Sequence, residues 1–220
     1  EEGRFYWRVA ARDYMGRFSA PSEERLIVYD AKPPVTDRLL EGTTGQNGWY
    51  IAPVSVAFIS TDAVAGVKGT YYSVDGSSFA LYSSTFALAV EGARVLKYYS
   101  VDASGNKEAE TTFDVKIDLS SPTVLSSVSP APNKAGWNNA PVAVLFTGSD
   151  TVSGIAYCSS SAAVSEEGAG QAVTGYCADY AGFTASATVT VNLDLSAPQV
   201  YISSPAGVGR YAATRDRIAI

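Results

Sequence analysis

The sequence predicts an all-β protein made of β-sandwiches, and three observations lead to this prediction. The chain has 220 residues, 46% hydrophobic and 17% charged, which is the composition of folded protein and the length of about one to three domains. Tyrosine (14) and glycine (19) are frequent and methionine occurs once, a balance that favours strands and tight turns over helices. Short apolar runs with turn signals at intervals of about 8 to 12 residues are typical of a sandwich.

The same landmarks occur twice along the chain. Gly48-Trp49 recurs as Gly136-Trp137, which is 88 residues later. The other landmarks at this offset are Pro53 with Pro141, Asp62 with Asp150, and Gly66 with Gly154. Later landmarks recur at offsets of 76 or 77: Glu91-Gly92 with Glu167-Gly168, Asp102 with Asp179, and Gly105 with Gly182. The second copy is therefore shorter by about a dozen residues, which predicts a shortened hairpin where the first copy has 71–84.

Each copy is predicted to contain a series of short strands. In the first copy the predicted strands are Val54–Ile59, Val67–Val74, Phe86–Val90, Arg94–Val101 and Thr111–Ile117, and Asp75-Gly76 is a two-residue hairpin signal. In the second copy they are Pro141–Thr147, Ile155–Cys158, Ala162–Val164, Gln171–Ala178 and Ala185–Leu193. Pro122 and Pro198 are expected to stiffen the linkers "DLSSP" and "DLSAP" that follow the copies.

The repeat also predicts how the chain divides into domains. An Asp-x-x-Gly spacing followed by an alternating strand occurs at residues 13, 102 and 179, so the first such segment is expected to end an earlier unit. The predicted parts are an incomplete domain at 1–32, complete domains at 33–121 and 122–197, and the first strands of a further domain at 198–220.

These motifs resemble a known class of domains. "TDAVAGV" (61–67), "SDTVSGI" (149–155), "VEGARVLKYYSVDASGN" (90–106) and the "IDLSSP" exit are similar to tandem bacterial Ig-like repeats of secreted and cell-surface proteins. "FYWRVAARDYMGRFSAPSE" (5–23) resembles the end of a fibronectin type III domain. The resemblance implies Ig-like and fibronectin III-like sandwiches in a linear array that acts as a stalk, spacer or adhesive module. Phe183 departs from the pattern, because the first copy has Asn106 there.

Charge and composition argue against several classes of function. The net charge is −6 and the isoelectric point is about 4.7, so no basic face is expected for nucleic acid or for anionic membranes. The chain has no histidine, which removes histidine-based catalysis and the usual zinc sites and indicates a protein that is not an enzyme. No apolar stretch approaches the length of a membrane helix, and the first residues do not form a signal peptide.

The repeated aspartates have two readings. In the first reading, Asp13, Asp102 and Asp179 cap a turn in which the glycine takes the left-handed conformation. In the second reading, aspartates at the domain junctions bind calcium, which takes six to eight oxygen ligands. The candidate ligands are Asp62, Asp102, Asp118, Asp150, Asp179 and Asp194, joined by Asp30 at the exit of the first segment. No cofactor is predicted apart from this calcium.

The aromatic residues also have two readings. Trp49 and Trp137 precede a strand in each copy, and we expect them to seal the sandwich cores. The alternative is sugar stacking, which the tyrosines at 71, 72, 82, 98 and 99 would assist.

Cys158 and Cys177 are the two cysteines of the chain, and both fall in the second copy. They lie on the predicted strands Ile155–Cys158 and Gln171–Ala178, which correspond to the third and sixth of the about seven strands expected in an Ig-like sandwich. These two strands are neighbours in an Ig-like sheet, so a disulfide is geometrically feasible. An extracellular location favours this bond over two buried thiols.

Two functions follow from these observations. The first is a structural or adhesive segment of a large extracellular surface protein, part of a stalk, fibre, sheath or surface layer. Its partners would be neighbouring domains of the same chain, other copies of itself or surface glycans. The second is an accessory, carbohydrate-binding region of a secreted polysaccharide-degrading enzyme. Both place the protein outside the cell or on its surface.

Overall fold

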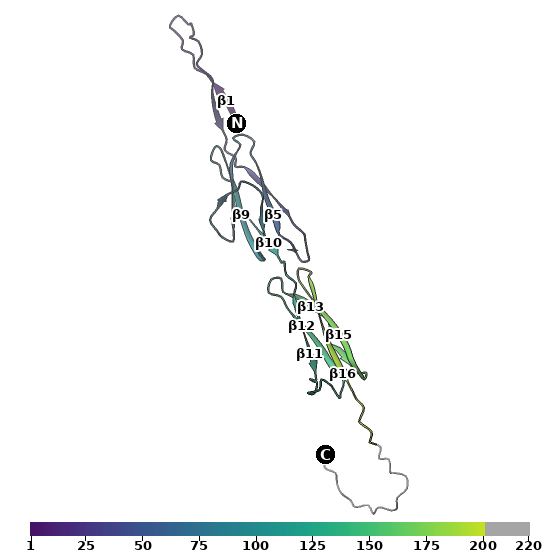
Figure 1. The fold of residues 1–220 in the computed structure, drawn as a ribbon. Helices are drawn as coiled ribbons and strands as arrows, with labels where there is room; N and C mark the ends of the chain where they lie inside the picture. The colour runs from purple at the N-terminus through teal and green to yellow at the C-terminus, as the bar shows by residue number, and fades with distance from the viewer. Residues whose placement is uncertain (201–220) are drawn as a thin grey trace, which may run out of the picture.

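The computed structural model describes residues 1–200, and every regular element in this part of the chain is a β-strand (Figure 1). The strands are β1 (Gly3–Trp7), β2 (Arg25–Tyr29), β3 (Val35–Glu41), β4 (Trp49–Tyr50), β5 (Val54–Thr61), β6 (Val67–Val74), β7 (Ala80–Leu81), β8 (Phe86–Leu88), β9 (Gly92–Asp102), β10 (Thr111–Ile117), β11 (Thr123–Ser129), β12 (Val142–Ser149), β13 (Ile155–Cys158), β14 (Ala162–Val164), β15 (Gly168–Asp179) and β16 (Thr184–Leu193). The predicted all-β fold is confirmed. The strands predicted for 198–220 lie, from residue 201 onward, outside the described residues.

Strands β1 and β2 form a hairpin at the start of the chain. They pair antiparallel from Gly3 with Tyr29 to Trp7 with Arg25. Large apolar side chains on both strands are exposed, because no second sheet covers either face in the described part of the chain.

Strands β3 to β10 form the first sandwich. The five-stranded sheet β4-β10-β9-β6-β7 faces the three-stranded sheet β3-β5-β8. β10 shows how the sequence produces this arrangement, because Phe113, Val115 and Ile117 are buried while Asp114 and Lys116 between them are exposed. This period of two places one apolar face of each sheet in the interior. The buried core comprises Val54, Val56, Phe58, Leu96, Tyr98, Phe113, Val115 and Ile117.

Strands β11 to β16 form the second sandwich from two three-stranded sheets, β11-β12-β14 and β13-β15-β16. Its buried core comprises Val142, Val144, Phe146, Val164, Val191 and Leu193. The ten strands predicted within the two copies are confirmed: four have the predicted bounds, and the ends of the other six shift by at most three residues. The sequence reading did not identify β3 and β11, the first strand of each sandwich.

The hairpin predicted to differ between the copies does differ. In the first sandwich, β7 pairs with β6 after the Asp75-Gly76 turn, where both residues have positive φ angles of 51° and 76°. In the second sandwich, β13 pairs with β15 alone, and no counterpart of β7 occurs among the described strands. The shortened hairpin and the two-residue turn are both confirmed.

The predicted role of the tryptophans as core seals is wrong. Trp137 is 37% exposed, and neither Trp49 nor Trp137 packs in the buried core of its sandwich. Trp49 instead lies on the short edge strand β4, with the Lys116 ammonium 6.0 Å from its ring centroid. Alternating apolar side chains of the other strands form the two cores instead.

A disulfide and a hydroxyl network occupy equivalent places in the two sandwiches. Cys158 and Cys177 are directly paired across β13 and β15 and form a disulfide. The equivalent pair in the first sandwich is Thr70 and Ser100 on β6 and β9, whose hydroxyls lie 2.8 Å apart.

Glu108 completes the hydroxyl network of the first sandwich. Its carboxylate accepts hydrogen bonds from the Thr36 hydroxyl at 2.5 Å and from the Ser100 backbone N–H at 2.6 Å, and Ser60 joins Thr70 at 2.5 Å. Where the first sandwich has Ser60, the second has Gly148, and a Cβ there would lie 2.8 Å from the Cys177 sulfur. The glycine therefore provides the space that the disulfide fills.

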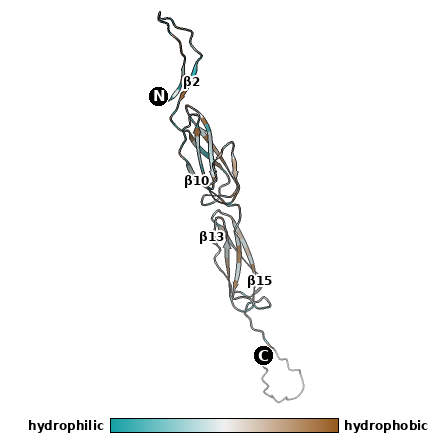
Figure 2. Ribbon diagram, turned by 90° about the vertical axis from the view of Figure 1, so that its left-hand side faces the viewer, coloured by the Kyte–Doolittle hydropathy of each residue, from teal (hydrophilic) through white to brown (hydrophobic). Residues whose placement is uncertain are grey.

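The hairpin and the two sandwiches follow one another in a line, and two views at right angles show the same elongated shape (Figures 1 and 2). Residues 30–34 connect β2 to β3, and residues 118–122 connect β10 to β11. We call the surroundings of these two segments the first junction and the second junction. Within residues 1–200 no helix is long and apolar enough to cross a membrane.

Replacing Gly175 with alanine should destabilise the second sandwich. A Cβ at this position on β15 would overlap the ring of Phe146, which is buried in the core with 3% exposure. Overpacking of this kind costs about 1–3 kcal/mol. Urea unfolding measures the effect. Gly168→Ala on the same strand is the control, because its Cβ would meet only the flexible side chain of Gln171 at 3.3 Å. Equal stability of the two variants would contradict the packing explanation.

Removing the disulfide with Cys158→Ala and Cys177→Ala together should lower the stability of the second sandwich by about 3 kcal/mol, because the bond closes a loop with a sequence separation of 19 residues. Urea unfolding with and without a reducing agent measures this loss. The first sandwich contains no cysteine, so its unfolding transition serves as the internal control and should not move.

Candidate functional site

One aspartate turn occurs three times, and its backbone geometry is the same each time. Asp13, Asp102 and Asp179 each accept on Oδ1 the backbone N–H of the residue four positions later, at 2.9, 2.8 and 2.9 Å. The glycine three positions later has a φ of 86°, 95° and 103°, respectively, which an L side chain rarely adopts. The predicted turn-capping role is confirmed for all three aspartates.

The three turns differ in the side chain four positions after the aspartate. Arg17 donates from Nε to Asp13 Oδ2 at 2.8 Å, and Asn106 donates from Nδ2 to Asp102 Oδ2 at 2.7 Å. Phe183 stands at this position in the third turn and cannot donate. Asp179 Oδ2 is therefore buried without a hydrogen-bond partner among the described residues.

At the first junction, Asp30, Asp62 and Asp102 come together from the linker and from two loops of the first sandwich. One carboxylate oxygen of each lies within 4.8 Å of the others. Asp30 uses both oxygens, because it accepts the N–H groups of Lys32 at 3.1 Å and Ala65 at 2.9 Å.

The Asn106 amide occupies the middle of the first junction. Besides Asp102, its Nδ2 donates to the backbone carbonyl of Asp30 at 3.0 Å and approaches that of Lys32 at 3.4 Å. One neutral amide thus joins the linker to the sandwich and satisfies the buried carboxylate.

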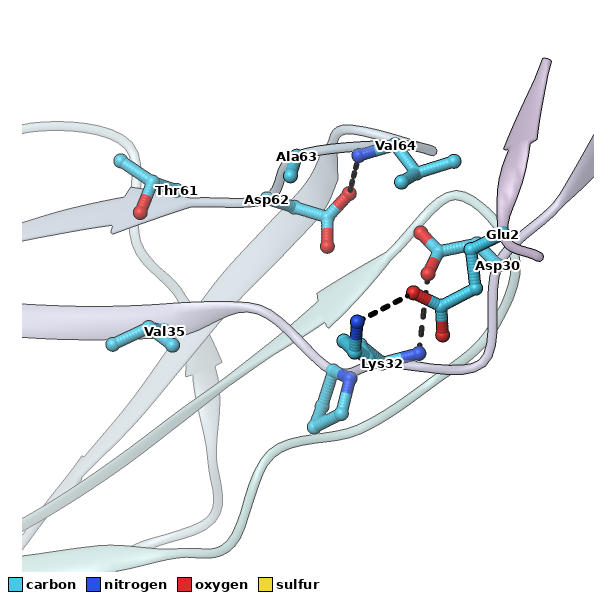
Figure 3. Close-up of a pocket in the computed structure, with 9 residues that line it drawn as sticks. Glu2, Asp30, Lys32, Val35, Thr61, Asp62, Ala63 and Val64 are labelled. Atoms are coloured by element: carbon cyan, nitrogen blue, oxygen red, sulfur yellow. Dashed lines mark hydrogen bonds and ion pairs between the residues drawn. The ribbon is translucent and has the colours of Figure 1, made fainter.

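Charged groups surround the first junction as well. Figure 3 shows Asp62 accepting the Val64 N–H at 3.2 Å, and Lys32 beside Glu2, with 2.8 Å between ammonium and carboxylate. Arg4 from the hairpin donates to the Val64 carbonyl at 3.1 Å. These contacts join the hairpin to the first sandwich.

At the second junction, Asp118, Asp150 and Asp179 form the equivalent group, again with one oxygen of each within 4.8 Å of the others. Asp118 and Asp179 are fully buried, with 0% exposure. In each carboxylate Oδ1 serves the local loop: Asp118 accepts from Ser120 N–H at 3.1 Å, and Asp150 accepts from Gly154 N–H at 2.7 Å. Among residues 1–200, the Oδ2 atoms of Asp118 and Asp179 have no hydrogen-bond partner. The hydrogen bonds of Asp150 go to its Oδ1.

The pKa values of the two buried turn aspartates, Asp102 and Asp179, are shifted in opposite directions, and the Asn106 side chain is one cause of the difference. Burial by itself raises the pKa of Asp102, but hydrogen bonds from the Asn106 side chain and from nearby backbone N–H groups outweigh burial, so the pKa lies below its ordinary value. For Asp179, burial outweighs the backbone hydrogen bonds. The charges of Asp118 and Asp150 act in the same direction as burial, so the pKa of Asp179 is raised.

Main-chain contacts fix the second junction from the other side. Gln46 of the first sandwich donates its backbone N–H to the Ala181 carbonyl at 2.8 Å, and Asn47 Nδ2 donates to the Tyr180 carbonyl at 2.9 Å. These acceptors belong to the same turn as Asp179, so the loop that carries the free carboxylate also forms the interface.

The structure sorts the six predicted calcium ligands. Asp62 and Asp102 lie at the first junction, Asp118, Asp150 and Asp179 at the second, and Asp194 is exposed and joins neither group among residues 1–200. Sequence reasoning did not find that Asn106 occupies the first junction or that Glu108 closes the hydroxyl network. The departure at Phe183 was the available signal for the first of these.

A comparison with known protein families finds no matching family model. A comparison with curated proteins also finds no match.

Replacing Asn106 with alanine should destabilise the first sandwich and its junction. The substitution leaves Asp102 Oδ2 buried without a donor, which costs about 1–3 kcal/mol or more for a charged group. Urea unfolding measures the loss. The control is Asn139→Ala, which removes an exposed amide that makes no side-chain hydrogen bond within residues 1–200. Unchanged stability of Asn106→Ala would show that the amide does not satisfy this carboxylate.

Proposed function

We propose that the chain is a structural or adhesive segment of a large extracellular surface protein, in which it acts as a stalk, spacer or assembly module. The observation that carries the proposal is the linear order of hairpin and sandwiches with hydrogen-bonded junctions (Figure 1). A chain whose neighbouring units are fixed end to end transmits position and force along its length. A linker without such contacts would allow each unit to turn freely.

The nature of the units supports the same proposal. Two sandwiches with repeated turns and exits fit tandem bacterial Ig-like domains, and the first hairpin fits the end of a fibronectin III-like domain. The exits repeat in detail, because Asp30, Asp118 and Asp194 each accept the N–H two residues later, at 3.1, 3.1 and 3.0 Å. A repeated exit gives every unit the same start to its linker, as a regular array requires. Fold alone names no ligand.

A non-enzymatic role agrees with the chemistry of the described residues. Both cysteines are in the disulfide, and the chain has no histidine. The buried hydroxyls of the first sandwich bond to one another, and the Thr36 hydroxyl also donates to the Glu108 carboxylate. These bonds favour a structural role for the hydroxyls over a role as nucleophiles. A location outside the cell fits a domain that carries a disulfide.

Antibodies raised against this chain should label the surface of intact source cells, and small-angle scattering of the purified chain should give a narrow, elongated particle. Labelling only after the cells are opened would contradict the surface location. A compact or widely variable particle would contradict the stalk, independently of where the protein is found.

A second candidate is a carbohydrate-binding accessory region of a secreted enzyme. Two pairs of tyrosines favour it. Tyr157 and Tyr176 are 54% and 48% exposed, and their ring centroids lie 6.0 Å apart. The ring of Tyr71 stacks on that of Tyr99 with 5.2 Å between the centroids. Exposed aromatic faces can stack on sugar rings. Affinity electrophoresis against a panel of polysaccharides tests this candidate, and retardation that Tyr157→Ala and Tyr176→Ala abolish would favour it over the stalk. No retardation would exclude these tyrosines as a glycan site.

A further inference from the structure

We propose that the second junction binds one calcium ion through Asp118, Asp150 and Asp179, whereas the first junction is held by the Asn106 amide and needs no metal. The proposal does not depend on the stalk function, since it concerns only the contacts within this chain.

The free carboxylate oxygens are the first reason. Each of the three aspartates uses Oδ1 to cap its own loop, and Oδ2 is left over. Two of these atoms, in Asp118 and Asp179, are buried with no partner in the described structure. A buried carboxylate without a partner is costly, so side chains that are nine-tenths or more buried are normally paired or bound to a metal. One carboxylate oxygen of each of the three aspartates lies within 4.8 Å of the others, despite the mutual repulsion of their charges.

The first junction provides the comparison within the same molecule. There the Asn106 nitrogen lies among acceptors only, namely the Asp102 carboxylate at 2.7 Å and the carbonyls of Asp30 and Lys32 at 3.0 and 3.4 Å. A group that donates must occupy such a place. At the second junction Phe183 replaces the amide, while the three aspartates remain, so the place is open to a cation.

Charge is the third reason. The first junction includes two cations, Lys32, which pairs with Glu2, and Arg4, which donates to the Val64 carbonyl. Asp30 accepts a backbone N–H on each of its two oxygens. None of the ion pairs formed among residues 1–200 involves Asp118, Asp150 or Asp179. Three carboxylates without a neighbouring lysine or arginine need compensation from a bound positive charge.

The chemistry of the ligands selects the ion. All available donors are oxygens, which excludes metals that prefer sulfur or nitrogen. Calcium accepts irregular sets of six to eight oxygens and is satisfied by carboxylates completed with backbone carbonyls and water. Magnesium demands near-ideal octahedral geometry and usually keeps several waters, so three converging carboxylates in a buried site suit it less.

Bound calcium would link two parts of the chain. Asp118 lies on the linker that leaves the first sandwich. In the second sandwich, Asp150 lies on the loop after β12 and Asp179 is the last residue of β15. The ion would therefore connect linker and sandwich in the way that Asn106 connects Asp30 and Asp102. Calcium at millimolar concentration should raise the melting temperature of the second sandwich and leave that of the first unchanged.

Isothermal titration of the full chain with calcium chloride, after treatment with a chelator, tests the proposal. We expect one ion per chain, and Asp118→Asn should weaken binding by at least about tenfold because the site loses one charged ligand. Asp13→Asn is the matched control: the same turn occurs there, but Arg17 already pairs with the carboxylate, and Asp13 belongs to neither group of three aspartates within residues 1–200, so calcium binding should not change.

The reciprocal variant Phe183→Asn is the most specific test. It supplies the second junction with the amide that the first one has, so calcium binding should be lost or strongly weakened while the melting temperature without calcium is kept or raised. The absence of binding by the unsubstituted chain at millimolar calcium would overturn the proposal. Binding that Asp118→Asn and Phe183→Asn leave unchanged, or that magnesium matches in affinity, would overturn it as well.

Discussion

A buried carboxylate must be paired, and this constraint organises both junctions of the molecule. An Asp-x-x-Gly turn follows β9 and another follows β15. Each buries its aspartate where the preceding unit of the chain is attached, which is the hairpin for Asp102 and the first sandwich for Asp179. One oxygen is satisfied by the backbone of the turn, at 2.8 Å in Asp102 and 2.9 Å in Asp179. The second oxygen needs a donor or a cation from outside the turn. The way in which that need is met decides how each junction is held.

The two sandwiches solve the same structural problems with different chemistry. In the first sandwich, the hydroxyls of Thr70 and Ser100 bond across the paired strands, and Glu108 accepts the Ser100 N–H. In the second sandwich, the Cys158–Cys177 disulfide joins the equivalent positions. The disulfide adds a covalent link to the sandwich that has the shorter chain and lacks the extra hairpin. Such substitutions at equivalent positions show that the backbone framework tolerates a change from polar network to covalent bond, provided that a small residue such as Gly148 makes room.

A few loop residues form the contacts between the units. Hydrogen bonds from Asn106, Gln46 and Asn47 cross the junctions. The side chain after the turn glycine therefore decides the character of a junction. With Asn106 the junction has an amide that donates to the aspartate, and with Phe183 it has three carboxylates and no such donor. This position offers a simple route to tune stiffness along an array of otherwise similar units.

The sequence by itself determined the all-β class, the repeat, most strand positions and the turn-capping role of the aspartates, because period-two patterns and Asp-x-x-Gly turns are local properties. It did not determine which of the repeated aspartates meet. Asp118 and Asp179 are far apart in the chain, and only the packing of the linker against the second sandwich places them together. The tryptophans failed as core markers for a related reason, since the space available between two sheets depends on all the side chains that fill it. The difference between Asn106 and Phe183 was visible in the sequence, but its meaning depends on three-dimensional contacts across the junction.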